Sequence, residues 1–282
     1  MKLSSSFFCA ALVSSAALAW SPLHAELIVY EGFAYPGGIE NPGDVGSGGT
    51  KSGEAPSQGG TGLAAPKLPS GRQPLVITEE GLSYTDPAGK SLLIAGLAAR
   101  APQKDSAVYP LYSPSSSDPL ERLRDPANPE VFGKPGSTLW FSFLMKVDGD
   151  ITTATQSVLK LGQSHMALGI CNNDRSDAPY IRISGPASKV VAEPGQTYLI
   201  VGKIEFGEAS SADDRNDKVQ IWVDPQLGEQ EPIEPPSTAL EGTNARLGDF
   251  WIETAPAEAN TASTFDEIRI GETFLDVTPL NP

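Results

Sequence analysis

The sequence predicts an all-β protein built as an antiparallel β-sandwich, and three observations carry this prediction. Apolar and polar residues alternate along about a dozen short stretches, which is typical of half-buried strands. The 282 residues include 28 glycines and 25 prolines, roughly 19% together against a background of about 12%, which implies many turns. Helical periodicity is nearly absent, and strands that do not alternate with helices favour a sandwich over a parallel α/β fold.

The clearest strand signals are stretches in which every second residue is apolar, so that one face of the strand is buried. The strongest lie at 138–147, 197–206, 218–224 and 265–270, and shorter ones at 27–30, 75–78, 82–85, 92–95, 158–161, 180–183 and 250–252. The one helical signal is a turn or two at 118–124, where Asp118 is a candidate N-cap and Pro119 occupies the first turn. Composition predicts loops at 36–74, which is rich in Gly and Pro, and at 228–243.

Residues 1–25 are predicted to be a cleavable signal peptide. Lys2 supplies the charged start, the apolar run 7–19 holds no charged residue, and a small-residue exit ends at Ala25. The run is too short to span a bilayer stably, and no second apolar run of sufficient length follows. We therefore expect a secreted protein without a membrane span, in the extracellular space, at the cell surface or in the periplasm. We expect its mature part, 26–282, to be a single domain.

Charge and cysteine content exclude several classes of function. With 20 basic and 35 acidic residues the chain has a net charge of -15, which repels phosphate backbones and argues against nucleic acid as a partner. Cys9 lies in the predicted signal peptide, so Cys171 is alone in the mature chain. Neither an intramolecular disulfide nor a cysteine zinc site is then available.

Catalytic motifs are missing from the sequence. Retaining glycosidases need two carboxylates about 5 Å apart, but Arg269 stands where the middle acid of such a motif would be in 267–272. Asp266 and Glu267 are neighbours, expected on opposite faces of a strand and either solvated or paired with arginine. The mature chain has one histidine, His165, and no Gly-x-Ser-x-Gly elbow. We expect the protein not to be an enzyme.

Calcium is the only cofactor for which the sequence offers candidate ligands. Asp213, Asp214 and Asp217 cluster with Asn216 in a predicted hairpin loop, and hard oxygen ligands in loops suit calcium. Asn172, Asn173, Asp174 and Asp177 form a second cluster. The same residue types are also what tight turns use, so both interpretations stay open.

Several segments resemble the exported bacterial concanavalin A-like, laminin-G-type jelly rolls. They are Leu27–Tyr35, Gly81–Gly89, Leu139–Phe143, Phe265–Gly271 and Asp276–Pro279, of which the last two are similar to the closing strand of that family. The resemblance implies two curved antiparallel sheets whose first and last strands are near neighbours. It further implies a non-catalytic module of the kind found on polysaccharide-associated proteins, and laminin-G-type domains often hold calcium. The motif is a folding signature and carries no site residue.

The tryptophans are the remaining functional signal. Trp140, Trp222 and Trp251 each lie in a predicted strand, and Trp140 and Trp222 point away from the main aliphatic rows of theirs. We expect these two to stack on sugar rings at a concave sheet face, making the protein a carbohydrate-binding module. The alternative interpretation of the two rings is a second hydrophobic layer covered by loops. Alternative functions are a structural or adhesive matrix protein, and a polysaccharide-degrading glycoside hydrolase or lyase.

Overall fold

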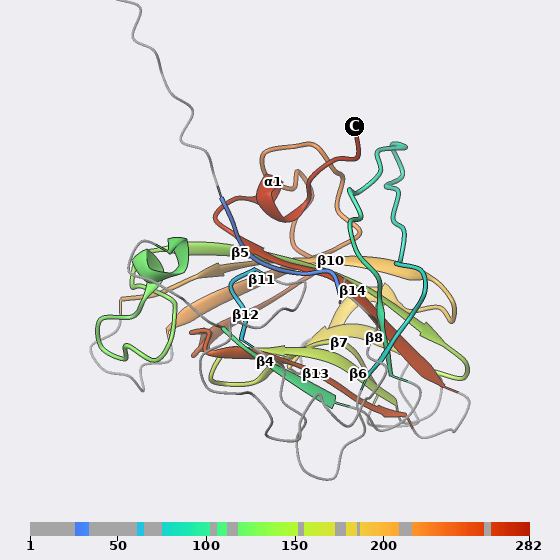
Figure 1. Ribbon diagram of the computed structural model, residues 1–282, viewed down its shortest axis with the longest axis horizontal. Coiled ribbons are helices and arrows are strands. Elements are labelled where there is room, and N and C mark those ends of the chain that lie inside the picture. The colour runs from blue at the N-terminus through green and yellow to red at the C-terminus, as the bar shows by residue number, and fades with distance from the viewer. Residues whose placement is uncertain are drawn as a thin grey trace, which may run out of the picture.

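The computed structural model describes residues 26–33, 61–64, 75–101, 106–111, 118–151, 155–172, 179–184, 187–208, 216–256 and 261–282. The predicted signal peptide and most of the predicted loop at 36–74 lie outside the described residues. Within them, the strands form two antiparallel sheets that stack as two layers (Figure 1). The predicted all-β antiparallel sandwich is thereby confirmed.

One sheet has eight strands and contains the strongest sequence signals. Its order is β12 (Thr238–Thr243), β11 (Asp217–Val223), β10 (Thr197–Glu205), β5 (Thr138–Asp148), β14 (Ala262–Gly271), β3 (Ala99–Ala101) and β2 (Val76–Ile77), and β1 (Leu27–Glu31) pairs with the second half of β14. The first and last described strands are therefore neighbours, as the resemblance implied.

The other sheet has six strands and lies below the first in Figure 1. Its order is β4 (Ser106–Pro110), β13 (Asp249–Pro256), β6 (Thr155–Leu161), β7 (Met166–Asn172), β8 (Tyr180–Ile183) and β9 (Ala187–Val191). Every pairing in both sheets is antiparallel.

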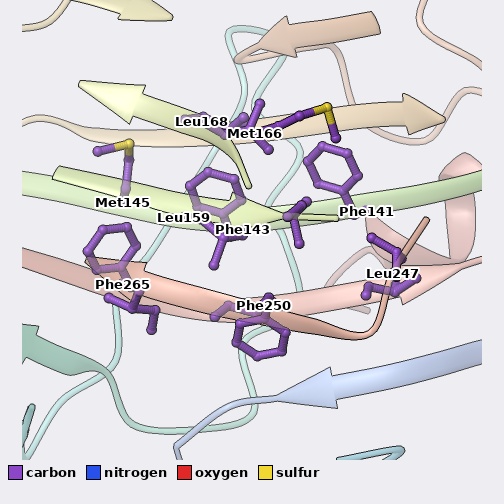
Figure 2. Packing of buried hydrophobic residues seen from close by; sticks show 14 of the residues in the cluster. Phe141, Phe143, Met145, Leu159, Met166, Leu168, Leu247, Phe250 and Phe265 are labelled. Carbon is purple, nitrogen blue, oxygen red and sulfur yellow. The ribbon is translucent and has the colours of Figure 1, made fainter. Parts of the chain in front are cut away.

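The main core fills the space between the two sheets. The alternating residues of β5, among them Phe141, Phe143 and Met145, face Leu159 of β6 and Phe250 of β13 (Figure 2). All are at most 2% exposed. Alternation in sequence thus selected the inward rows correctly, because successive side chains of a strand point to opposite faces.

A second hydrophobic layer covers the opposite face of the eight-stranded sheet. We call residues 78–98, 225–237 and 273–281 the cover layer. Its apolar side chains pack on the outward residues of β5, β10 and β11, giving a separate buried cluster of Leu82, Tyr84, Leu92, Ala98, Trp140, Leu144, Leu199, Val201, Trp222, Leu227, Phe274 and Val277. The central strands of the eight-stranded sheet are therefore buried on both faces.

The structure corrects four details of the secondary structure. Residues 82–85 and 92–95 are not strands but belong to the cover layer. Residues 238–243, predicted as loop, form the edge strand β12. The expected closing strand at 276–279 is instead α1 (Phe274–Val277) and the residues after it, because Thr273 and Asp276 form a capping box.

The predicted turn at 118–124 is confirmed. It is the 3-10 helix η1 (Pro119–Leu123), capped by Asp118 as expected.

Candidate functional site

The two tryptophans predicted to bind sugar lie under the cover layer. Trp140 is 3% and Trp222 is 7% exposed, and their ring centroids are 5.5 Å apart. The indole N–H of Trp222 donates to the carbonyl of Glu234 at 2.8 Å, and Phe274 packs edge-on against Trp140. Both rings do point away from the main core, but neither offers a face to a ligand. The expectation that these two rings form an open platform for a sugar is therefore wrong. They belong to a second hydrophobic layer covered by other segments, which was the alternative interpretation.

Asp217, predicted as a calcium ligand, is instead part of a buried ion cluster. Its carboxylate accepts hydrogen bonds from the N–H groups of Gly207 at 3.0 Å and Ala245 at 2.8 Å, and it lies 3.4 Å from Nη1 of Arg246. The Nε of Arg246 is 2.7 Å from Oδ2 of Asp125. Burial raises the pKa of Asp217, and the guanidinium and the two N–H donors act against that rise.

The other calcium candidates, Asp213 and Asp214, lie outside the described residues, as do Asn173, Asp174 and Asp177. Within the part of the chain that the structure describes, no group of three or more His, Cys, Asp or Glu residues is placed to hold a metal ion. The same part holds no helix long and apolar enough to cross a membrane.

The outward side of the six-stranded sheet gathers the remaining candidate functional side chains. Because Phe250 and Ile252 of β13 point into the main core, Trp251 and Glu253 point outward. The same alternation directs further polar side chains outward from β6 and β8, namely Gln156, Lys160, Tyr180 and Arg182. We call these six residues the outer face.

Trp251 is the centre of the outer face. It is partly exposed, and it lies directly across from Lys160 in the β13–β6 register. Nζ of Lys160 donates to Oε2 of Glu253 at 2.8 Å, so a charged hydrogen-bonding pair flanks the indole. The Trp251 N–H is buried without a hydrogen-bond partner among the described residues. Such groups are rare in native structures, because each costs about 1–3 kcal/mol.

His165 lies against Trp251 from the turn between β6 and β7. The two rings are 5.4 Å apart at an interplanar angle of 67°, an edge-to-face contact. His165 has a φ of 48°, a left-handed conformation that is uncommon for histidine. The turn is held in place by hydrogen bonds from the N–H groups of Gln163 to Arg246 and of Ser164 to Asn244. The backbone of Asn244 and Arg246 therefore anchors the turn that carries His165.

The far side of the outer face is formed by β8. Arg182 lies over the ring of Tyr180 at 5.8 Å, a cation–π contact. Gly169 of β7 is in register with both Arg182 and Val158. A Cβ at Gly169 would lie 2.4 Å from the carbonyl oxygen of Ser157, and its φ is 137°, so this position requires glycine.

The sequence does indicate that Trp251 points away from the core, but less clearly than it does for Trp140 and Trp222. Trp251 alternates with Phe250 and Ile252, which is enough to place it on the face opposite the core. The stretch is short, however, and alternation does not say which sheet face is covered by later segments. Lys160 and Glu253 are 93 positions apart in sequence, so their pairing depends on a register that no local pattern gives.

Comparison with known proteins gives structural similarity only. No protein-family model matches the sequence, and no curated protein matches it. Domain 4 of AbnA, a GH43 extracellular arabinanase from Geobacillus stearothermophilus in complex with arabinotriose, is 10% identical, with 88% of this chain and 93% of that chain covered and a TM-score of 0.41.

Two further solved structures are similar over part of their length. The Trypanosoma rangeli sialidase is 14% identical over 72% of this chain and 31% of its own, with a TM-score of 0.38. The ligand binding domain of botulinum neurotoxin serotype D in complex with N-acetylneuraminic acid is 9% identical over 71% and 43%, with a TM-score of 0.33. This chain thus spans less than half of either protein. Likeness at this level says nothing about ligand or activity, so the function has to be argued from the site.

Proposed function

We propose that the protein is an exported, non-catalytic carbohydrate-binding protein with a concanavalin A-like sandwich, and that Trp251 is the centre of its binding site. The observation that carries the proposal is the partly exposed indole of Trp251, which is in edge-to-face contact with His165 and is flanked by the Lys160–Glu253 pair. An aromatic face beside charged hydrogen-bonding groups suits a sugar ring, which has an apolar C–H face and polar hydroxyl groups. The net charge of -15 favours neutral over acidic glycans.

Two features of the outer face support a binding role over a hydrolytic one. The carboxylate of Glu253 is engaged by Lys160. The other outward acid that the structure describes on β13 is Asp249, four residues away or about 13 Å along an extended strand. Glycoside hydrolases need their two carboxyl groups about 5–9.5 Å apart.

The test is a glycan array with the mature protein, followed by titration calorimetry of Trp251→Ala and Trp251→Phe on the best-bound neutral glycan. Losing a stacking anchor worth about 1–3 kcal/mol weakens binding roughly tenfold or more, and Trp251→Phe should retain part of it. The melting temperature of each variant is measured alongside, because a loss of binding counts only if the variant stays folded. Unchanged affinity in a folded Trp251→Ala variant would refute the site. Absence of glycan binding combined with self-association would favour a structural or adhesive protein.

A further inference from the structure

The last strand, β14, carries an unusual group of buried charges on the side that faces the cover layer. Asp266 and Glu267 are 0% exposed and Arg269 is 2% exposed. Opposite β5, the register of β14 shifts between Asp266 and Arg269, and Glu267 has a φ of 51°. This β-bulge inserts one residue, so that Phe265 and Ile268, three apart in sequence, both reach the main core.

Because of the bulge, both neighbouring acids bind the cover layer instead of pointing to opposite faces. Asp266 accepts the N–H of Leu82 at 2.7 Å, and Glu267 accepts the N–H of Ala95 at 2.8 Å. Arg269 donates to the carbonyl of Leu93 and to Glu267. Three polar side chains of β14, those of Asp266, Glu267 and Arg269, thus bind three backbone groups of the segment 78–98. The expected pairing of the acids with arginine is confirmed for Glu267, while solvation is found for neither.

Glycines bring the backbones close enough for this arrangement. A Cβ on Gly81 would lie 2.9 Å from Oδ2 of Asp266, and one on Gly96 would lie 1.8 Å from the carbonyl oxygen of Gly32. Tyr30 of β1 completes the enclosure and donates to Glu267 at 3.0 Å. Water therefore has little access to the carboxyl groups while the segment 78–98 is in place.

The charge count in this enclosure does not balance when both acids are ionised. Glu267 is neutralised by Arg269, which leaves Asp266 as a buried charge with no counter-ion of its own. Tyr30 stays neutral, because burial and Glu267 raise its pKa. No charged side chain of the segment 78–98 is in hydrogen-bond contact with Asp266 among the described residues. The β5 residues opposite are Ser142 and Leu144, which carry no charge.

Two further acids near β14 are directed elsewhere. Glu31 of β1 accepts the N–H of Phe33 at 2.7 Å. Asp276 of α1 accepts the N–H of Thr273 and so caps its own helix. The surplus charge can therefore be removed in two ways. Asp266 can hold a proton, or the segment 78–98 can move away and admit water.

We propose that Asp266 and the segment 78–98 form a pH-dependent latch, which is closed while Asp266 is protonated and opens more readily once it ionises. Opening removes Leu82, Tyr84 and Leu92 from the second hydrophobic cluster and so uncovers part of the outward face of the eight-stranded sheet. Burial raises the pKa of Asp266 to about 7, and the nearby carboxylate of Glu267 adds to the rise. If the carboxyl returns to its ordinary pKa of 3.8 when the segment opens, the opening equilibrium increases about 50-fold between pH 5 and pH 7.

Hydrogen–deuterium exchange of the intact protein tests this latch, with exchange times scaled for the intrinsic tenfold change per pH unit. In the wild type we expect protection of amides in 78–98 to fall about 50-fold from pH 5 to pH 7, while β10 stays protected. Asp266→Asn, which keeps an oxygen acceptor for Leu82, should lose the part of this pH dependence that Asp266 causes and keep only the smaller part due to Asp224, whose carboxyl group interacts with Tyr84 of the same segment. Asp148→Asn, a change at an exposed acid, should behave like the wild type.

Two results would overturn the proposal. One is protection of 78–98 that does not depend on pH in the wild type, or that falls equally in β10. The other is an Asp266→Asn variant that responds to pH as the wild type does. If Asp266→Asn does not fold, the comparison of the segment 78–98 with β10 in the wild type decides the question alone.

Discussion

Replacing Trp222 with alanine separates a buried structural tryptophan from a binding one. The side chain is 7% exposed, it lies 5.5 Å from Trp140, and its N–H donates to the Glu234 carbonyl. Truncation of a buried tryptophan costs about 3–5 kcal/mol, because the lost contacts leave a cavity in close-packed surroundings. For a chain of this size, 1 kcal/mol shifts the melting temperature by about 2–4 °C, so we expect a decrease of roughly 6–20 °C.

The assay is urea unfolding followed by circular dichroism, with calorimetry for the melting temperature. Trp251→Ala is the matched control, because it removes the same side chain from a partly exposed position and should cost well under half as much. The reasoning fails if Trp222→Ala lowers the free energy of unfolding by less than about 1 kcal/mol, or if both variants lose the same amount. Either result would mean that the cover layer does not bury Trp222 in solution.

Three further predictions concern buried charge and backbone. Arg246→Ala should lower the free energy of unfolding, measured in urea, by about 3–5 kcal/mol, because it leaves two buried aspartates without their arginine. Arg122→Ala, at an exposed ion pair, should lower it by less than about 1 kcal/mol. Burial raises the pKa of Asp224 to about 6, so its contribution to stability is fully present below about pH 4 and is lost as pH rises through 6. Asp224→Asn, which suits the φ of 52° there, should flatten that part of the stability–pH profile; an unchanged profile would contradict the assignment. Gly169→Ala should lower the melting temperature measurably, since its Cβ would meet the Ser157 carbonyl; an unchanged melting temperature would show that the strand can adjust.

The inward rows of the sandwich could be predicted from sequence because they depend on a strictly local rule. In β5, β10 and β11 the side-chain period of two places one row in the core whatever the rest of the chain does. The same rule placed Trp222 on the far side of its strand correctly. It could not show that side chains about 140 residues earlier in the chain, such as that of Leu82, would cover that side.

The candidate site and the buried charges depend on contacts that local rules do not contain. From residue type alone, Arg246 and Arg269 are expected on the surface, since arginine is seldom fully buried unless paired. Their partners are fixed only by register and by loop conformation. The regular alternation expected over 265–270 was wrong at one point, because Phe265 and Ile268 are three positions apart and a regular strand cannot place both on one face. That spacing indicates a bulge, and the bulge is what brings Asp266 and Glu267 to the same side.

The pairing of the first and last strands has a mechanical consequence. β1 and β14 are antiparallel with Leu27 opposite Gly271, so the start of one strand and the end of the other lie at the same end of the pair. Tension applied between residue 26 and the C-terminal segment first breaks the hydrogen bonds that join Pro279 to Leu93 and Asn281 to Ser91. The tension then breaks the β1–β14 hydrogen bonds one after another from that end, because the force acts parallel to the bonds and perpendicular to the strands. A pull in this direction unravels the sandwich from its edge at low force, whereas sliding β5 along β10 would require nine paired positions to yield together.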